Sequence, residues 1–373
     1  MTPVRTDSPV LVVGTGLLGT SVALGLRSQG VEVLLSDASP VALGLAADYG
    51  AGHIAQAANA QEAQALADPA AHTPKLVVVC VPPDVAGQVL LEQLRAWPEA
   101  IVTDVTSVKT APLHTVREHG GDLARYLGSH PMAGRETGGP LAGRANLFLG
   151  RPWVITSHEE TTVRALQEVE GLALDLGATV VNMDAEAHDS AVALISHVPQ
   201  LISSVMASQL VEDDANAASL AGGGLRDVTR IAASDPTMWN QILAANGPRV
   251  ARILRDIARD IDGLADALEN MDAPGARRAV ADRMIAGNRG VARIPGKHGT
   301  TQMYETFTVL IDDAPGQLAK LFNDIGETGV NIEELRLEHA QGAKLGLAQL
   351  AVLPEHRVRL MDELQHRAWK VAE

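Results

Sequence analysis

The stretch that decides the fold is Val10-Leu11-Val12-Val13-Gly14-Thr15-Gly16-Leu17-Leu18-Gly19. Its β-branched start predicts a short buried strand, and the residues after the glycines follow helical spacing. The glycines therefore form a Gly-x-Gly-x-x-Gly turn between a strand and a helix. A second predicted strand, Val31 to Ser36, closes the unit with Asp37 just beyond its end. This order is typical of a Rossmann-type, α/β dinucleotide-binding domain.

The same turn predicts the cofactor. Its glycines let the backbone approach a pyrophosphate, and the N–H groups at the helix start face the phosphates. Asp37 is expected to accept hydrogen bonds from the ribose hydroxyls and to repel a 2′-phosphate, which favours NAD over NADP. A βα turn that binds no nucleotide is the alternative. The predicted NAD site comprises Gly14, Gly16, Leu17, Leu18, Gly19, Asp37, Val81, Pro82 and Asp104.

The uncharged run from Ser8 to Leu26 raises the alternative of a membrane span or a signal peptide. Four glycines and several hydroxyl residues lower its apolar density, and no small-residue cleavage site ends it. We therefore expect no membrane segment there.

Composition excludes further classes. The 45 acidic and 30 basic residues leave a net charge of −15, and only 3% of residues are aromatic, so nucleic acid is not an expected partner. The single cysteine, Cys80, can form no disulfide within the chain, and a cytoplasmic location is expected. His188 and His197 lack the i, i+4 spacing of a helical metal pair, so we predict no metal site.

Three further predicted strands place polar residues at one edge of the sheet. They run from Lys75 to Val81, from Ile101 to Asp104 and from Tyr126 to Ser129. Ligands of open parallel sheets bind beyond the carboxyl ends of the strands. The residues that follow these ends and become site candidates by position are Ser107, Lys109 and His130.

The chain changes character after residue 183. Residues 184–293 show only helical periodicity, with predicted helices at His188–Leu210, Pro236–Ala245, Pro248–Glu269 and Pro274–Ala286. Apolar residues on several sides of these helices predict packing against a second copy, hence a homodimer. After a polar linker, residues 302–373 follow a β-α-β-β-α-β order, the split βαβ or ferredoxin-like arrangement, which begins with a strand from Tyr304 to Ile311. We therefore predict three domains: 1–183, 184–293 and 302–373.

Several motifs together resemble one enzyme family. They are Gly14-x-Gly16-x-x-Gly19, Asp104-x-x-Ser107-x-Lys109, Gly128-Ser129-His130-Pro131-Met132-Ala133-Gly134, His188-Asp189, Ser196-His197-Val198-Pro199 and Arg226-Asp227-x-Thr229-Arg230. This set is similar to the prephenate/arogenate dehydrogenase family of tyrosine biosynthesis. The last module, with Asp313-Ala314-Pro315-Gly316-Gln317-Leu318 and Gly329-Val330-Asn331-Ile332, resembles an amino-acid-sensing ACT domain.

The resemblance implies NAD-dependent oxidative decarboxylation of prephenate to 4-hydroxyphenylpyruvate. It makes His130 the base that accepts the hydroxyl proton, with Ser107 hydrogen-bonded to the same hydroxyl and to the imidazole. The implied substrate-binding residues are Arg230, His197, Gln200, Glu136 and Ser129. A tyrosine effector is implied at the ACT domain, with Asp313, Gly316, Gln317, Leu318 and Asn331 as regulatory residues. For His188 we expect a structural hydrogen bond.

Gln200 departs from the family pattern, because many relatives that use prephenate have a histidine there. A neutral amide tolerates an ammonium group better than a histidine does, so arogenate dehydrogenase is the alternative function. A different β-hydroxyacid or imine dehydrogenase with NAD(P) and a non-catalytic sensor of NAD and an amino acid are two further readings.

Overall fold

The computed structural model describes residues 3–134, 137–211, 220–294, 304–339 and 345–372. These residues form two compact units, 1–258 and 259–373. This division falls inside the predicted helical domain 184–293, and the predicted boundaries at residues 183, 293 and 302 stay a prediction.

A five-stranded parallel sheet lies at the centre of the first unit. Its strands pair in the order β3-β2-β1-β4-β5, and Val10 of β1 lies between Val33 of β2 and Leu76 of β4. From β1 the chain adds β2 and β3 on one side, and it then returns to add β4 and β5 on the other side of β1. Rossmann folds bind dinucleotides in the crevice at the point where the strand order reverses in this way. This confirms the Rossmann-type prediction. The strands are β1 (Val10–Val13), β2 (Val33–Ser36), β3 (His53–Ile54), β4 (Leu76–Val79) and β5 (Ile101–Asp104).

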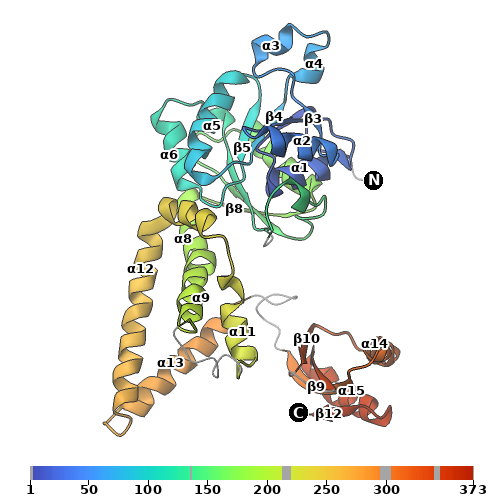
Figure 1. Ribbon diagram of the computed structural model, residues 1–373, viewed down its shortest axis with the longest axis vertical. Coiled ribbons are helices and arrows are strands. Elements are labelled where there is room, and N and C mark those ends of the chain that lie inside the picture. Colours follow the sequence, from blue (N-terminus) through green and yellow to red (C-terminus); the bar gives the residue numbers. More distant parts are fainter. Residues whose placement is uncertain (1–2, 135–136, 212–219, 295–303, 340–344, 373) are drawn as a thin grey trace. The chain divides into compact units, whose positions relative to one another are not determined.

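Helices cover both faces of this sheet, so its strands are almost continuously apolar. Val10 and Val12 pack on one side with residues of α1, while Leu11 and Val13 pack on the other side with residues of α5. Figure 1 shows α1 and α2 on one side of β4 and β5, and α5 and α6 on the other. The helices are α1 (Leu17–Arg27), α2 (Pro40–Asp48), α3 (Ala60–Gln64), α4 (Pro69–His72), α5 (Pro83–Ala96), α6 (Thr110–Glu118) and α7 (Val163–Asp175).

A second, three-stranded sheet carries the candidate base. Its strand β6 (Gly128–Pro131) is antiparallel to β7 (Pro152–Thr156), which is parallel to β8 (Thr179–Met183). Short 3-10 turns, η1 (Leu123–Arg125) and η2 (Pro140–Ala142), lie before and after β6. His130 therefore lies inside a strand, whereas the sequence pattern ended that strand at Ser129.

The helices that follow differ from the prediction at two places. The predicted helix from His188 is divided into α8 (Ala185–Val192), a π-helical turn η3 (Ala193–His197) and α9 (Val198–Ser208). The two helices predicted on either side of Gly247-Pro248 are one continuous helix, α12, so that division was wrong. Further on lie α11 (Gly223–Thr229), η4 (Arg230–Ala232), α12 (Pro236–Glu269) and α13 (Ala276–Val291).

Packing explains why α12 continues through its proline. Proline removes one helical hydrogen bond and costs about 3 kcal/mol in a helix interior. Ile242, Asn246 and Val250 are buried at i, i+4 and i+8, so they form one continuous buried stripe across Pro248. Gly247 also has no Cβ to meet the proline ring. Burial on both sides of Pro248 outweighs the local penalty.

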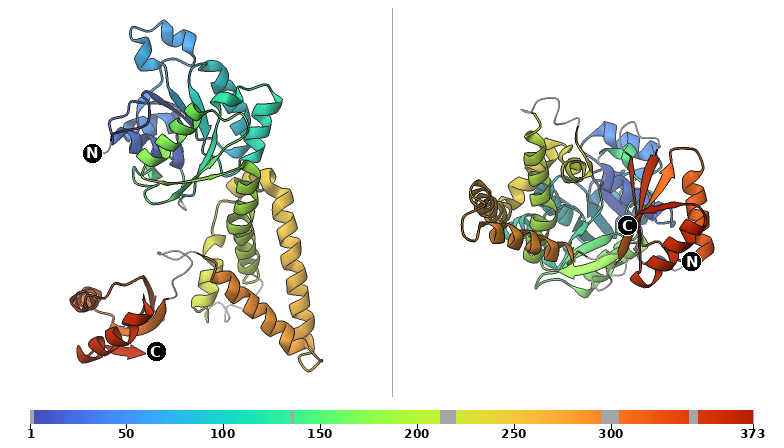
Figure 2. Two further views of the ribbon diagram at one scale, coloured as in Figure 1. Left: turned by 180° about the vertical axis from the view of Figure 1, so that it is seen from behind. Right: turned by 90° about the horizontal axis from the view of Figure 1, so that it is seen from below.

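The second unit contains the predicted β-α-β-β-α-β module. Its antiparallel sheet has the order β10-β11-β9-β12, and its core includes Phe307, Leu321, Leu350 and Leu360. Helices α14 and α15 lie on one face of this sheet (Figure 2, orange to red). The elements are β9 (Glu305–Asp312), α14 (Gln317–Thr328), β10 (Glu334–His339), β11 (Leu345–Val352), α15 (Pro354–His366) and β12 (Lys370–Ala372).

Candidate active site

The glycine turn after β1 is held by close backbone contacts. Gly14 has φ +94°, and a Cβ there would lie 2.5 Å from the carbonyl oxygen of Cys80. A Cβ on Gly19 would lie 1.9 Å from the carbonyl oxygen of Gly14. Packing within the protein therefore requires both glycines.

Gly16 differs from these two glycines. Among the described residues, no atom lies within 4 Å of the position that its Cβ would occupy. Helix α1, which starts at Leu17, has no side-chain cap and no acidic residue in its first turn. Open space beside a bare helix N-terminus fits the close approach of a pyrophosphate. The residues present thus fit a dinucleotide.

Asp37 lies against the same turn. Its carboxylate accepts hydrogen bonds from the Thr15 N–H at 2.5 Å, the Thr15 hydroxyl at 2.8 Å and the Ser39 N–H at 2.7 Å. It therefore joins the end of β2 to the glycine turn. Val81 also lies here, with its side chain 3.1 Å from the Cβ position of Gly14, and Pro82 caps the start of α5. Contact of Asp37 with a ribose stays a prediction.

Asp104 is fully buried, which differs from its predicted contact with the cofactor. It forms an ion pair with the fully buried Lys109 and accepts hydrogen bonds from the Tyr126 hydroxyl at 2.8 Å and the Thr106 N–H at 2.9 Å. Burial lowers the pKa of Lys109, and the charge of Asp104 opposes that shift. Lys109 also donates to the carbonyl oxygen of Ser129 at 2.6 Å. This cluster supports the strand ends from inside the protein.

Ser129 is likewise fully buried, although the resemblance placed it against substrate. Its hydroxyl donates to the carbonyl oxygen of Asp104 at 2.9 Å and accepts from the Thr103 hydroxyl at 3.1 Å. Its hydroxyl is therefore bonded within the protein and is not exposed to a substrate in this structure. Alternation along β6 explains the difference, because Ser129 points to the face opposite to that of His130.

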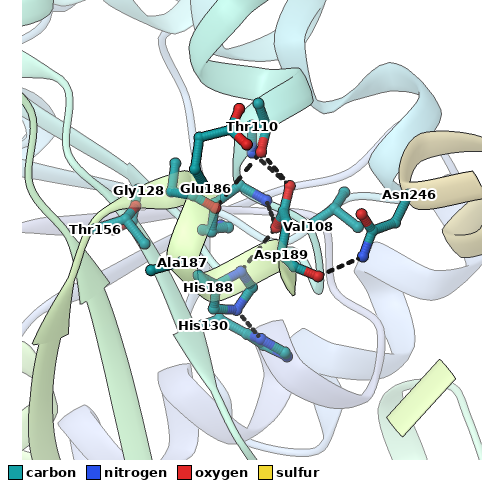
Figure 3. Close-up of polar contacts among 12 residues, drawn as sticks. Val108, Thr110, Gly128, His130, Thr156, Glu186, Ala187, His188, Asp189 and Asn246 are labelled. Carbon is teal, nitrogen blue, oxygen red and sulfur yellow. Dashed lines mark hydrogen bonds and ion pairs between the residues drawn. The ribbon is translucent and has the colours of Figure 1, made fainter. Parts of the chain in front are cut away.

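Two histidines and a carboxylate form a chain of hydrogen bonds behind the candidate base (Figure 3). Nδ1 of His130 lies 2.9 Å from Nε2 of His188, and Nδ1 of His188 lies 2.8 Å from Oδ1 of Asp189. His130 comes from β6, whereas His188 and Asp189 come from α8. Within the described residues, Nε2 of His130 has no hydrogen-bond partner.

Asp189 also caps helix α6. Its carboxylate accepts from the Lys109 N–H at 2.8 Å, the Thr110 N–H at 2.9 Å and the Thr110 hydroxyl. Burial alone would raise the pKa of Asp189, but the hydrogen bonds from His188, Thr110 and Lys109 lower it to about 2. A carboxylate at a helix N-terminus is also stabilised by the helix dipole. Asp189 is therefore an anion at neutral pH.

The surroundings of His130 keep it neutral. Burial holds the pKa of His130 well below its usual value, and His188, Lys109 and His197 lower it further, while Asp189 acts in the opposite direction. A neutral imidazole has one nitrogen with a lone pair, so it can accept a proton. His130 thus has the protonation state that a general base needs.

A second pair of polar residues lies on the helices. The Asn246 amide of α12 lies 3.2 Å from Nδ1 of His197, and the ring of Trp239 meets the His197 ring edge-on at 6.0 Å between centroids. Burial lowers the pKa of His197 to about 4. Gln200 is buried in α9, where its side-chain oxygen accepts from the Ser234 hydroxyl at 3.3 Å.

The remaining predicted site residues are not joined to this network by a described hydrogen bond. Ser107 is half-buried after β5, and the nitrogen of His130 that faces protein is paired with His188 rather than with Ser107. Arg230 is exposed in η4. Glu136 lies outside the described residues. The roles of Ser107, Arg230 and Glu136 stay predictions.

Sequence reasoning missed the residues that hold the histidines. His188 was expected to make only a structural hydrogen bond, and Asp189 and Asn246 received no role in the site. The adjacent His188-Asp189 pair was the one visible signal. Neither its pairing with His130, 58 positions away, nor that of Asn246 with His197, 49 positions away, follows from spacing.

The parallel sheet and the bare helix N-terminus beside Gly16 define a Rossmann-type, dinucleotide-binding protein whose sheets are followed along the chain by a helical region. Family models give the narrower assignment. Residues 22–182 match the nucleotide-binding domain of prephenate dehydrogenase, and residues 184–281 match its dimerization domain. The chain belongs to the prephenate dehydrogenase family.

Individual relatives agree with this assignment. A probable prephenate dehydrogenase of Streptomyces niveus, NovF, is 34% identical, and the match covers 96% of this chain and 98% of NovF. The crystal structure of prephenate dehydrogenase from A. aeolicus with hydroxyphenyl propionate and NAD+ has a TM-score of 0.65 at 25% identity; the match covers 76% of this chain and 98% of that one. Synechocystis arogenate dehydrogenase has a TM-score of 0.61 at 26% identity, with 76% and 99% covered.

Proposed function

We propose that the chain oxidises prephenate with NAD+ and releases 4-hydroxyphenylpyruvate and CO2, a step of tyrosine biosynthesis. The observation that carries this proposal is His130, a neutral histidine whose Nδ1 is held by His188 and whose Nε2 has no partner within the described residues. Its position beyond the parallel sheet is where Rossmann enzymes place their chemistry.

The proton balance of the reaction defines what His130 has to do. Bound NAD+ supplies the hydride acceptor for the hydrogen on ring carbon C4. His130 accepts the proton of the C4 hydroxyl as a carbonyl forms there. Loss of the ring carboxylate as CO2 returns an electron pair to the ring, which becomes aromatic and leaves negative charge on the same oxygen. That oxygen takes a proton back, so no net proton is released.

The other substrate contacts follow the family resemblance. Arg230 is assigned to the ring carboxylate, since a guanidinium binds carboxylates with two hydrogen bonds. Glu136 is assigned to pairing with Arg230, and Ser107 to the C4 hydroxyl. His197 and Gln200 are assigned to the side chain of the substrate, and the neutral amide of Gln200 makes arogenate the second candidate substrate.

The test is a comparison of prephenate and arogenate, each with NAD+ and NADP+, followed by absorbance of the reduced nicotinamide. Turnover of prephenate with NAD+ is expected to be fastest. His130→Asn should abolish turnover while NADH binding persists, and His119→Asn provides a control at an exposed histidine. Residual activity near the wild-type rate in His130→Asn would remove His130 as the base. Faster oxidation of arogenate than of prephenate would make arogenate the preferred substrate.

We also propose a homodimer formed through the helical region. Exposed apolar side chains gather there, with Leu194 58%, Ile195 62% and Val205 60% exposed. The stretch Ala185–Ser208 is long and apolar enough by composition to cross a membrane, but it contains the buried His188 and Asp189 of the site. A second copy therefore suits this surface better than lipid. With one free cysteine, Cys80, the cytosol is the proposed compartment.

Light scattering tests the dimer. Ile195→Glu should produce a monomer, because a charge in an apolar interface loses its water without gaining a partner. Val163→Glu, at a 71% exposed position of α7, is the matched control and should stay dimeric. A wild-type monomer at micromolar concentration would exclude the proposal.

For the C-terminal module we propose an ACT-type regulatory site that binds tyrosine. Neither family model extends beyond residue 281, whereas the NovF match covers 96% of this chain and so includes most of the module. A cavity of about 240 Å³ opens where β9 turns into α14, and the lining residues include Asp313, Gly316, Gln317 and Leu318. Gly316 leaves the N-terminus of α14 without a side-chain cap, which suits the carboxylate of an amino acid.

Calorimetry with tyrosine tests this site. Gln317→Ala should weaken binding, whereas Asn331→Ala should leave it unchanged, because Asn331 bonds to Glu333 and is not among the residues that line the cavity. That comparison also tests the predicted regulatory role of Asn331. The absence of heat and of any shift in melting temperature would contradict the tyrosine proposal.

A further inference from the structure

The hydrogen bonds around His188 determine where its proton lies. Asp189 is ionised, so its carboxylate only accepts hydrogen bonds, and Nδ1 of His188 must carry the hydrogen that it donates at 2.8 Å. A neutral His188 then has its lone pair on Nε2. Because Nδ1 of His130 lies 2.9 Å from that nitrogen, it donates its own hydrogen to such a His188. Neutral His130 is left with its lone pair on Nε2.

A separate set of contacts determines the proton of His197. The Asn246 amide nitrogen donates to the carbonyl oxygen of Asp189 at 2.7 Å, and the amide oxygen accepts from Arg249 at 3.2 Å. Rotating the amide by 180° would place its oxygen against the carbonyl oxygen of Asp189 and its nitrogen against the Arg249 guanidinium. Neither pair can form a hydrogen bond, so the orientation of the amide is determined. The second amide hydrogen is directed to Nδ1 of His197 at 3.2 Å. His197 therefore carries its hydrogen on Nε2.

We propose that two sets of positioning residues hold the site histidines in opposite tautomers. His188 and Asp189 keep the lone pair of His130 on Nε2, and Asn246 keeps the hydrogen of His197 on Nε2. The site thus presents one acceptor and one donor, both uncharged. The tautomer of His197 follows from the contacts of Asn246, that of His130 follows from its contact with a His188 that carries one ring hydrogen, and their catalytic consequence rests on the proposed function.

The proton balance of the reaction explains why fixed tautomers of His130 and His197 would favour catalysis. The substrate oxygen that loses a proton to His130 later takes one back, so the site has no proton to send to solvent. A fixed lone pair on His130 lets the proton move out and return along one line, and Asp189, through His188, stabilises the imidazolium while it exists. His188, Lys109, His197 and Asp189 are the titratable groups that act on the pKa of His130. Of these, Asp189 alone favours its charged form.

Nuclear magnetic resonance of the full-length protein labelled with 15N-histidine tests the tautomers directly. In the wild type, His130 should show a protonated Nδ1 and a bare Nε2, and His197 the reverse. His130→Asn and His197→Asn assign the signals by removing them. Any other tautomer at either histidine overturns the proposal, with or without measurable turnover.

Asp189→Asn and Asn246→Asp test the consequence. An asparagine carries no charge and has a single oxygen for the N–H groups of Lys109, Thr110 and His188, so it no longer fixes the hydrogen of His188 on Nδ1. The corresponding Asp→Asn change in a Ser-His-Asp triad lowers kcat about 10⁴-fold with the geometry intact. Through one additional histidine we expect a loss of about 10²- to 10⁴-fold in kcat, an unchanged KM for NAD+ and an altered His130 tautomer. In Asn246→Asp the carboxylate can only accept, so His197 should move its hydrogen to Nδ1.

Glu160→Gln is the matched control, because Glu160 bonds to Nδ1 of the buried His158 outside the site. Its kcat should equal that of the wild type. A purely structural role for Asp189 would lower stability while kcat per folded enzyme and the tautomer of His130 stayed unchanged, and that result would overturn the proposal. If the tautomers are as predicted but the protein oxidises neither prephenate nor arogenate, the proposed function is refuted and the tautomer proposal stands.

Discussion

Lys109→Met is expected to destabilise the first unit, because it leaves Asp104 buried without its cation. Both side chains have 0% exposure, so solvent cannot replace the lost charge. Removing one partner of a buried ion pair costs about 3–5 kcal/mol. Asp104 retains hydrogen bonds from Tyr126 and Thr106, so we expect the lower end, about 3 kcal/mol. For a unit of this size that equals a fall in Tm of roughly 6–12 °C.

The effect should extend to the site through the charge of Lys109, since the backbone N–H that binds Asp189 remains in the variant. Loss of the Lys109 charge removes one of the groups that lower the pKa of His130, so the acidic limb of the activity profile should move to higher pH. Urea denaturation followed by tryptophan fluorescence measures the stability, since Trp97 and Trp153 are buried in the same unit.

The double variant Asp104→Asn, Lys109→Met is the control. It keeps an oxygen that accepts hydrogen bonds but has no buried charge, so it should be more stable than Lys109→Met alone. Strong coupling between the two substitutions is expected for a contacting pair. The reasoning is refuted if Lys109→Met costs less than about 1 kcal/mol, or if the two substitutions simply add.

Three further outcomes follow from the structure. Gly16→Ala should fold normally and weaken NADH binding in a fluorescence titration, whereas Gly14→Ala should lower Tm, because its Cβ would meet the carbonyl of Cys80 at 2.5 Å; full NADH affinity in Gly16→Ala would place the pyrophosphate elsewhere. Asp37→Ser should raise the affinity for NADPH relative to NADH, since the repelling carboxylate is removed; an unchanged ratio in the same titration would exclude Asp37 from cofactor selection. The pKa of Asp189 is depressed to about 2, so its contribution to stability is complete above about pH 4 and is lost as the pH falls through 2. Urea denaturation between pH 5 and 2 should show a loss of about 2–3 kcal/mol in the wild type that is missing in Asp189→Asn, and equal slopes would contradict that pKa.

Local patterns accounted for most of the fold. The β-branched run at Val10–Val13, the glycine turn and the strand predicted from Tyr304 to Ile311 each depend on neighbours within a few residues, and each element is present. The prediction failed at Pro248, where a local rule ends the helix but long-range packing of Ile242, Asn246 and Val250 continues it.

The site divides in the same way. The sequence by itself determined the dinucleotide-binding unit and made His130 a site candidate, because a glycine fingerprint and a polar residue at a strand end are short-range signals. The role of base came from the family resemblance. Only the tertiary structure decided what holds that base. Asp104 and Ser129 looked available and are buried, while His188, Asp189 and Asn246 come from α8 and α12 to set the tautomers of His130 and His197. Hydrogen bonds between side chains depend on distances and directions that folding alone creates, and residue spacing in the chain does not encode them.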